Sequence, residues 1–91
     1  MSQFRDNVDD HRFEWAEQGE VAFADYRVDA HGVRAILHVE TPPHLRGQGV
    51  AKRLMDGAVA YAREADLKIR AICPYAVAYF KRYPEAVDVK A

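Results

Sequence analysis

One short segment of the chain combines the residue types that bind phosphate groups. It runs from Arg46 to Ala51 and places Gly47 and Gly49 two positions apart. Glycines at this spacing let the backbone turn so that successive N–H groups point at one anion, and they leave room for a ligand to approach. Arg46 adds a forked donor that matches phosphate oxygens. The segment therefore predicts a pyrophosphate site, formed by Arg46, Gly47, Gln48, Gly49, Val50 and Ala51.

The same glycine pair also occurs as a plain entry turn to a helix, so a loop that binds nothing is the alternative. The segment is not a Walker loop, because no Gly-Lys-Ser/Thr follows. It also lacks the third glycine of a dinucleotide fingerprint. The 13 basic and 14 acidic residues give a formal net charge of −1. Since this charge creates no field for nucleic acid or an anionic membrane, neither is an expected partner, and anion binding must be local.

Two titratable side chains precede the segment. Glu40 ends a strand-like run just before it, at the kind of strand end where ligands of open sheets gather. Its carboxylate is a candidate general base, and His38 is a candidate to assist or replace it. A solvated strand end without a catalytic role is the alternative for both residues.

Alternating apolar residues and intervening turns predict three strands, over residues 12–17, 21–28 and 33–40. The short connections between them indicate an antiparallel meander. In the third strand one face is expected to carry Val33, Ala35, Leu37 and Val39, and the opposite face Arg34, Ile36, His38 and Glu40.

After this meander the apolar residues recur at three- and four-residue steps. This pattern predicts an amphipathic helix over residues 49–65, packed on the sheet. Residues 67–72 follow as a short strand, expected to be parallel to strand 33–40 because a helix connects the two. A second helix is expected from Pro74 to about Arg82, and residues 86–89 as a short edge strand. The order β-β-β-α-β-α places the chain in the α+β class, with a mixed, mostly antiparallel sheet.

The 91 residues are enough for one core, so a single domain over residues 1–91 is expected. No apolar run approaches the roughly 18 residues that span a bilayer, and the N-terminus has no apolar signal core. The single cysteine, Cys73, cannot form an internal disulfide, which fits a reducing compartment. We therefore expect a cytoplasmic protein, a monomer or weak homodimer, without a metal site.

The loop and the order of elements resemble those of the GNAT N-acetyltransferases. Arg46-x-x-Gly49-x-Ala51 is similar to that family's Arg/Gln-x-x-Gly-x-Gly/Ala motif, whose backbone amides hold the pyrophosphate of acetyl-CoA. Strand 33–40 stands where the central strand of that fold stands, and strand 67–72 where its splayed neighbour stands. Residues 73–76 and 79–85 resemble a small single-domain branch that carries a cysteine-centred motif. The similarity covers about residues 12–85.

The resemblance implies a minimal GNAT-like fold that binds acetyl-CoA or coenzyme A. It implies acetyl transfer to an unidentified amine, carried by a small molecule or a protein, with a non-catalytic acyl-CoA-binding or sensing module as the alternative. A backbone amide near Val39 is the expected donor to the developing oxyanion. The two helices that wall the acceptor site in larger members have no counterpart between Phe13 and Glu40. The acceptor site is therefore expected to be open, or closed by a partner chain.

Two further residues are candidates because of the resemblance. Cys73 stands where the family usually has asparagine, so it is expected near the acetyl group as a nucleophile, a proton donor or a polar wall. A buried structural thiol is the alternative. The family's tyrosine proton donor aligns best with Phe80, one position after Tyr79. Tyr79 and Tyr75 are accordingly candidate donors to the leaving thiolate, or else core and wall residues.

Overall fold

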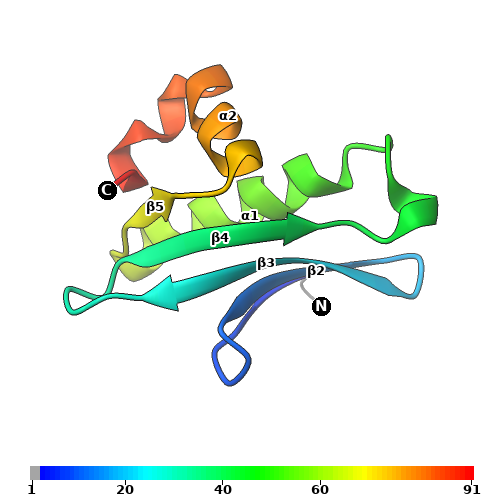
Figure 1. The fold of residues 1–91 in the computed structure, drawn as a ribbon, viewed down its shortest axis with the longest axis horizontal. Coiled ribbons are helices and arrows are strands. Elements are labelled where there is room, and N and C mark those ends of the chain that lie inside the picture. The colour runs from blue at the N-terminus through cyan, green and yellow to red at the C-terminus, as the bar shows by residue number, and fades with distance from the viewer. Residues whose placement is uncertain (1–2) are drawn as a thin grey trace.

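A computed structural model describes residues 3–91, and Figure 1 shows the order of its elements along the chain. The strands are β1 (Phe4–Asn7), β2 (Arg12–Glu17), β3 (Glu20–Val28), β4 (Arg34–Glu40) and β5 (Ile69–Ala71). The helices are α1 (Val50–Ala65) and α2 (Pro74–Arg82), with the 3-10 turns η1 (Pro43–Leu45) and η2 (Pro84–Val89). The five strands form one sheet in sequence order. Its pairs are antiparallel except β4 with β5, which confirms the α+β class and the mixed sheet.

The edge strand β1 is an element that the sequence pattern did not predict. Its four residues Phe4–Asn7 contain one apolar side chain, so they show no alternation to detect. Pairing with β2 places Phe4 opposite Trp15 and Asp6 opposite Phe13. The strand therefore exists because of its partner in the sheet, since its own composition does not favour a strand.

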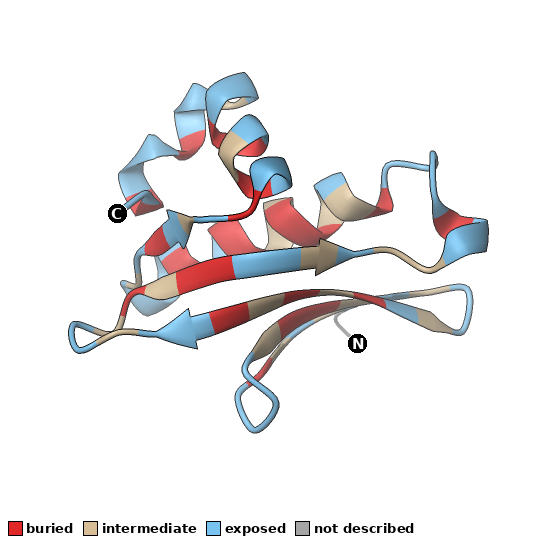
Figure 2. Cartoon of the chain, viewed as in Figure 1, coloured by how far each residue is buried: buried red, intermediate tan, exposed pale blue. Residues whose placement is uncertain are grey.

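Both helices pack on one face of the sheet, as Figure 1 shows. The buried side chains of α1 and α2 form one cluster with those of β2, β3 and β4, and Figure 2 shows this buried layer between the helices and the strands. The largest fully buried side chains are Phe13, Ile36, Leu45, Leu54, Met55, Ile69 and Val50. None of the helical elements of residues 3–91 lies over the other face, which is open to solvent.

The face assignment predicted for β4 is wrong in its second half. Register partners share a face, and Ile36 pairs with Tyr26 whereas His38 pairs with Asp25, which leaves Leu37 without a partner in β3. This β-bulge shifts the alternation by one residue. As a result Ile36 is fully buried beneath the helices while His38 lies exposed on the open face. A bulge cannot be detected from a pattern that assumes strict alternation.

The C-terminal segment also differs from the expected one. Residues 86–89 are not an edge strand but part of η2, in which Ala86 and Val89 are buried. Pro84 begins this turn and the chain then returns to the sheet through one bridge, between Lys90 and Ile69. The expected strand 67–72 is reduced to β5, Ile69–Ala71. No helix among residues 3–91 is long and apolar enough to cross a membrane.

Gly57 is the point at which α1 touches the edge strand. A Cβ at this position would lie 2.7 Å from Cδ1 of Phe4, closer than van der Waals contact allows. Phe4 in turn packs against Phe13 and Tyr61, with ring centroids 5.8 Å and 5.7 Å away. The absence of a side chain at Gly57 therefore allows β1 to be covered by the helix.

We predict that Gly57→Ala destabilises the protein. In an exposed helix this change stabilises by about 1 kcal/mol, because alanine has the higher helix propensity. Here the clash with Phe4 should outweigh that gain and give a net loss of about 1–2 kcal/mol. Urea denaturation monitored by circular dichroism measures it. In a Phe4→Ala background the same change should become stabilising, and a loss of equal size in both backgrounds would contradict the prediction.

Candidate functional site

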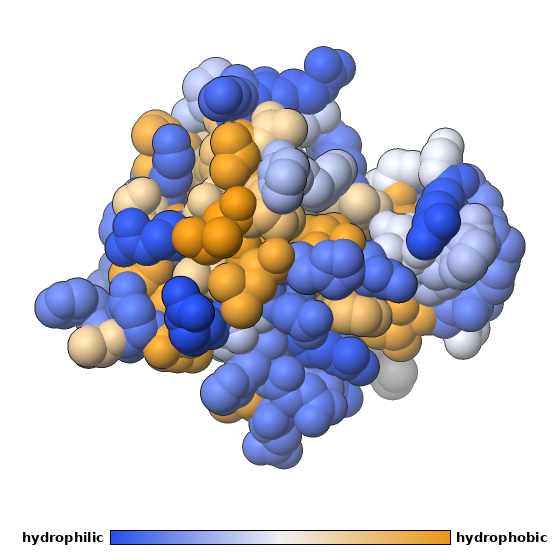
Figure 3. All heavy atoms as spheres, in the orientation of Figure 1, coloured by the Kyte–Doolittle hydropathy of each residue, from blue (hydrophilic) through white to orange (hydrophobic). Residues whose placement is uncertain are grey.

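The strands β4 and β5 part after a short pairing. They pair only over Arg34–Ile36 and Ile69–Ala71. Beyond this pairing β4 continues to Glu40, whereas the segment after β5 turns into α2. The carbonyl of Ile36 accepts hydrogen bonds from both Ile72 N and Cys73 N, at 3.1 Å each, and closes the narrow end of the opening. Beyond this point one edge of β4 has no partner strand. Exposed Leu37 and Ile72 flank the opening, where Figure 3 shows an apolar area in the middle of the view.

The predicted phosphate loop lies at the wide end of this opening. Gly47 and Gly49 have φ of +79° and +77°, in the left-handed region that favours glycine. Gly49 is the N-cap of α1, and no side chain caps the helix there. The first-turn N–H groups and the positive end of the helix dipole therefore lack a side-chain acceptor, which suits an anion.

A hollow of about 250 Å³ adjoins the loop. Its lining is Thr41, Leu45, Arg46, Gly47, Gly49, Val50, Ala51, Lys52 and Tyr75. Tyr75 brings the start of α2 to the same place as the start of α1. The structure thus gathers five of the six predicted loop residues around one cavity, and their role as ligands of a phosphate stays a prediction.

The side chains of the loop make contacts within the protein. Arg46 Nε donates to the carbonyl of Thr41 at 3.2 Å, and the Gln48 amide donates to the carbonyl of His44 at 2.8 Å. Val50 is almost fully buried, so its side chain anchors the helix while only its backbone can face a ligand. Val39 lies opposite Ala24, hence on the helix-covered face of β4.

His38 and Glu40 form a pair on the open face. His38 Nε2 lies 2.8 Å from Glu40 Oε1, and both side chains are about half exposed. Their register partners are Asp25 and Phe23 of β3. The pair therefore stands at the free end of β4, next to the strand opening and on the side away from the helices.

Cys73 lies at the narrow end of the opening and is largely buried. It is the N-cap of α2, and its Sγ accepts a hydrogen bond from Ala76 N at 3.4 Å. The thiol therefore points at the helix amides and has a capping role there. Whether it also contacts an acetyl group stays a prediction.

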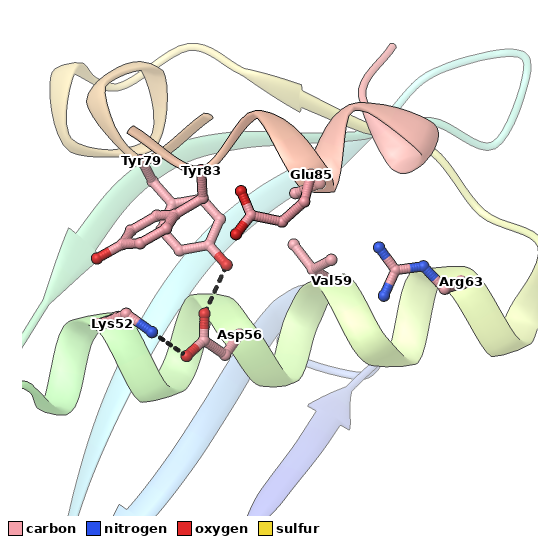
Figure 4. A pocket seen from close by; sticks show the side chains of 8 residues that line it. Lys52, Asp56, Val59, Arg63, Tyr79, Tyr83 and Glu85 are labelled. Carbon is pink, nitrogen blue, oxygen red and sulfur yellow. Dashed lines mark hydrogen bonds and ion pairs between the residues drawn. The ribbon is translucent and has the colours of Figure 1, made fainter. Parts of the chain in front are cut away.

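Tyr79 faces a groove between α1 and α2, which Figure 4 shows from close by. Its hydroxyl donates to Asp56 Oδ1 at 2.6 Å, and Lys52 Nζ binds the other oxygen of Asp56 at 2.7 Å. Burial and the hydrogen bond to Asp56 raise the pKa of Tyr79 well above its usual range. The proton of this candidate donor is thus directed at a carboxylate within the groove.

The groove contains Lys52 and, beside it, Asp56, a functional candidate that sequence reasoning missed. Lys52 lines the hollow at the loop and two further hollows of about 260 and 290 Å³ along the helices. Its ammonium lies 4.8 Å from the ring centroid of Tyr83. Asp56 was not singled out, although Lys52 and Asp56 are four residues apart on one helix, the spacing of helical ion pairs.

Arg53, by contrast, does not serve the groove. Its guanidinium binds Glu17 of β2 with two hydrogen bonds, of 3.1 and 2.8 Å, and Trp15 Nε1 donates to the same carboxylate. The hydrogen bonds from Arg53 and Trp15 lower the pKa of Glu17. This arrangement fixes the first turns of α1 on the sheet. Of the two neighbouring cations, Lys52 therefore lies in the groove and Arg53 binds the sheet.

Comparison with known proteins agrees with this geometry. The family described as GCN5-related N-acetyl-transferase matches residues 12–89, which is most of the chain. The chain belongs to this family. The solution structure of a GCN5-like protein from Staphylococcus aureus superposes with a TM-score of 0.71 at 31% identity, covering 100% of this chain and 91% of the other.

Curated relatives of this GCN5-related protein are similar over a shorter stretch. Protein NATD1 of Xenopus tropicalis and of Homo sapiens are each 40% identical to it over 49 residues. That stretch is 54% of this chain but only 45% and 43% of the two relatives. The chain thus matches less than half the length of these proteins.

We predict that Tyr79→Phe affects stability more than acetyl transfer. Loss of the hydrogen bond to Asp56 should cost about 1 kcal/mol of unfolding free energy. Because the hydroxyl faces Asp56, the rate of thiol release should stay within about threefold of the wild type, whereas loss of a general acid costs about 100-fold or more. Tyr75→Phe, at an exposed position, is the matched control for stability. Thiol release about 100-fold slower in the Tyr79→Phe variant than in the wild type would identify this tyrosine as the proton donor after all.

Proposed function

We propose that this protein is an acetyl-CoA-dependent N-acetyltransferase of the cytoplasm that transfers the acetyl group to an amine. The observation that carries the proposal is the uncapped helix start at Gly49, which opens into a lined hollow beside the unpaired edge of β4. A phosphate-bearing thioester needs an anion site and a gap between strands, and these lie next to each other here. Family membership supports acetyl-CoA as the donor.

Each part of acetyl-CoA has residues of the chain that suit it. The N–H groups of Gly49, Val50 and Ala51 would hold the pyrophosphate, and Arg46 would add its guanidinium. The opening between Leu37 and Ile72 would take the apolar arm that carries the thioester. In the groove, Lys52 and Arg82 flank the Tyr83 ring, with Lys52 Nζ at 4.8 Å and the Arg82 guanidinium carbon at 5.8 Å from its centroid. These cations would attract the remaining phosphate of coenzyme A.

The His38–Glu40 pair would supply the base. One oxygen of Glu40 is bound to His38, and the other is available to accept the proton of an amine on the open face. The unpaired edge of β4, from Leu37 to Glu40, would present a backbone N–H near Val39 to the developing oxyanion. Cys73, at the closed end of the opening, would border the thioester.

The alternative function is an acyl-CoA-binding module without turnover. It is favoured by the engagement of Tyr79 with Asp56, since the proton of this candidate acid is already donated to a carboxylate. Thiol release measured with a panel of small amines, polyamines and basic peptides separates the two functions. Binding of coenzyme A without release in the presence of any amine would favour the module.

We predict that acetyl-CoA and coenzyme A raise the melting temperature, and that Gly49→Ala removes this shift. A ligand at 100 times its Kd adds about 2.7 kcal/mol of stability. Alanine at position 49 keeps a strained φ of +77° and places its methyl group 3.3 Å from Nη1 of Arg53, so we expect the helix start that should hold the phosphate to shift. Differential scanning fluorimetry measures the shift.

Gly32→Ala is the matched control, because Gly32 has φ +78° and lies in the β3–β4 turn. It should lower the melting temperature by a similar amount yet retain the full ligand-induced shift. If neither acetyl-CoA nor coenzyme A raised the melting temperature of the wild-type protein, the proposed function would fail.

We predict that Glu40→Gln lowers kcat/KM about 100-fold or more, the loss typical of a missing general base. His38→Gln should have a smaller effect, since its amide can still donate a hydrogen bond to Glu40. Glu64→Gln removes one carboxylate from the exposed surface of α1 and should leave the rate unchanged. The rates are measured by thiol release with the best acceptor of the panel, and equal rates for Glu40→Gln and the control would rule out Glu40 as the base.

A further inference from the structure

The turn between β2 and β3 lies against the loop that should bind phosphate. Figure 1 shows both at the same end of the molecule, although Gln18 of the turn and Gln48 of the loop are 30 positions apart in the chain. Three side-chain pairs join the two segments: Glu20 with His44, Gln18 with Gln48, and Glu17 with Arg53. Because these pairs come before, between and after Gly47 and Gly49, the turn supports the loop along its whole length.

The turn itself is short and well defined. Glu17 pairs with Glu20 in the register, so only Gln18 and Gly19 connect the two strands. These two residues have φ of +52° and +75°, and type I′ turns require a positive φ at both positions. Glu17 is in addition joined to α1 by two hydrogen bonds from Arg53. The turn is therefore a fixed point of the fold against which a loop can be held.

The contact between Glu20 and His44 is the most specific of the three. Oε2 of Glu20 is shielded from solvent, although about a third of the side chain is exposed. Apart from Nε2 of His44, this oxygen has no partner among residues 3–91. A carboxylate oxygen accepts and does not donate, so His44 donates from Nε2. Loss of His44 would leave a shielded acceptor without a hydrogen bond, which is costly.

The loop residues that meet the turn are not those that border the hollow. Arg46, Gly47 and Gly49 line the hollow, whereas His44 and Gln48 do not. The Gln48 amide donates to the carbonyl of His44 at 2.8 Å, which links the two contacts with the turn. The turn therefore acts on the conformation of the loop, and its carboxylate is not placed to touch a phosphate in the hollow.

We propose that Glu20 is a positioning residue, which through His44 holds the phosphate loop in the conformation that binds the pyrophosphate of coenzyme A. This inference rests on the coenzyme A binding of the proposed function. Glycine loses more conformational freedom on ordering than any other residue, and the loop contains Gly47 and Gly49. A loop that is already ordered before the ligand arrives binds it more tightly, because less freedom is lost on binding.

The direction of the change in affinity separates positioning from a plain charge effect. Glu20 is a carboxylate in contact with a loop that should bind an anion. On charge alone its removal would strengthen coenzyme A binding, since like charges repel. If Glu20 holds the loop, its removal weakens binding instead. The two explanations thus predict opposite signs for one substitution.

The test is isothermal titration of the variants with coenzyme A. Glu20→Ala should raise the Kd about threefold to fivefold, the range of an exposed ion pair. Glu20→Gln keeps an oxygen that accepts from His44 and should stay within about twofold of the wild type. Asp9→Ala is the matched control, because it removes an exposed carboxylate from the β1–β2 turn, and it should not weaken binding. Unchanged or tighter binding by Glu20→Ala would overturn the inference, as would an equal loss in Glu20→Gln.

A double-mutant cycle shows whether Glu20 acts through His44. His44→Ala should also weaken coenzyme A binding, and adding Glu20→Ala to it should cause no further loss. Losses that multiply in the double variant would mean that the two residues act independently, and would overturn the inference. Urea denaturation establishes which variants are folded. Unchanged affinity of a folded His44→Ala would overturn the inference even if Glu20→Ala failed to fold.

Turnover gives a second readout. In the thiol-release assay Glu20→Ala should raise the KM for acetyl-CoA by the same factor as the Kd and leave kcat within about twofold, because uniform binding alone is lost. A fall in kcat with unchanged KM would overturn the positioning role. A wild-type protein that does not bind coenzyme A at all would instead overturn the proposed function, so the two failures are distinguishable.

Discussion

The separation of β4 from β5 at Ile36 is the constraint on which the rest of the molecule depends. Because the Ile36 carbonyl accepts from both Ile72 N and Cys73 N, the two strands stay joined at one end and cannot pair beyond it. This divergence leaves one edge of β4 unpaired, sends the chain into α2 at Pro74, and brings the starts of both helices beside the glycine loop. The hollow there exists because two parallel strands stop pairing early.

Side-chain pairs on the covered face then hold the two helices at the opening. Arg53 joins the first turns of α1 to Glu17 on β2. Asp56, one turn further along, joins α1 to α2 by accepting from Tyr79 while it binds Lys52. Exposed ion pairs of this kind each contribute little to stability, but here they orient the elements that border the groove. Lys52 is in this way held at the Tyr83 ring, within reach of all three hollows.

The bulge at Leu37 decides which residues of β4 face the helices and which face solvent. Before it, Ile36 packs beneath the helices; after it, His38 and Glu40 stand on the open face beside Asp25 and Phe23. Without the additional residue His38 would share the buried face with Ile36, because residues two apart on a strand lie on the same side. The side chain of Glu40 is therefore exposed to solvent by a local irregularity in the same strand whose free edge borders the opening.

Local pattern by itself determined the class of fold, the meander, both helices and the glycine loop, since alternation, helical periodicity and glycine spacing are properties of short segments. It also named His38 and Glu40 beside the strand opening, and the resemblance to the GNAT family added Cys73 at the closed end. Only the tertiary structure decided the rest. Strand β1 needs β2 as a partner, residues 84–89 coil because Ala86 and Val89 can be buried that way, and the bulge reverses the expected faces of β4. The partners of Tyr79 and Arg53 lie 23 and 36 positions away in the chain. Such contacts depend on how elements pack, and no local pattern encodes them.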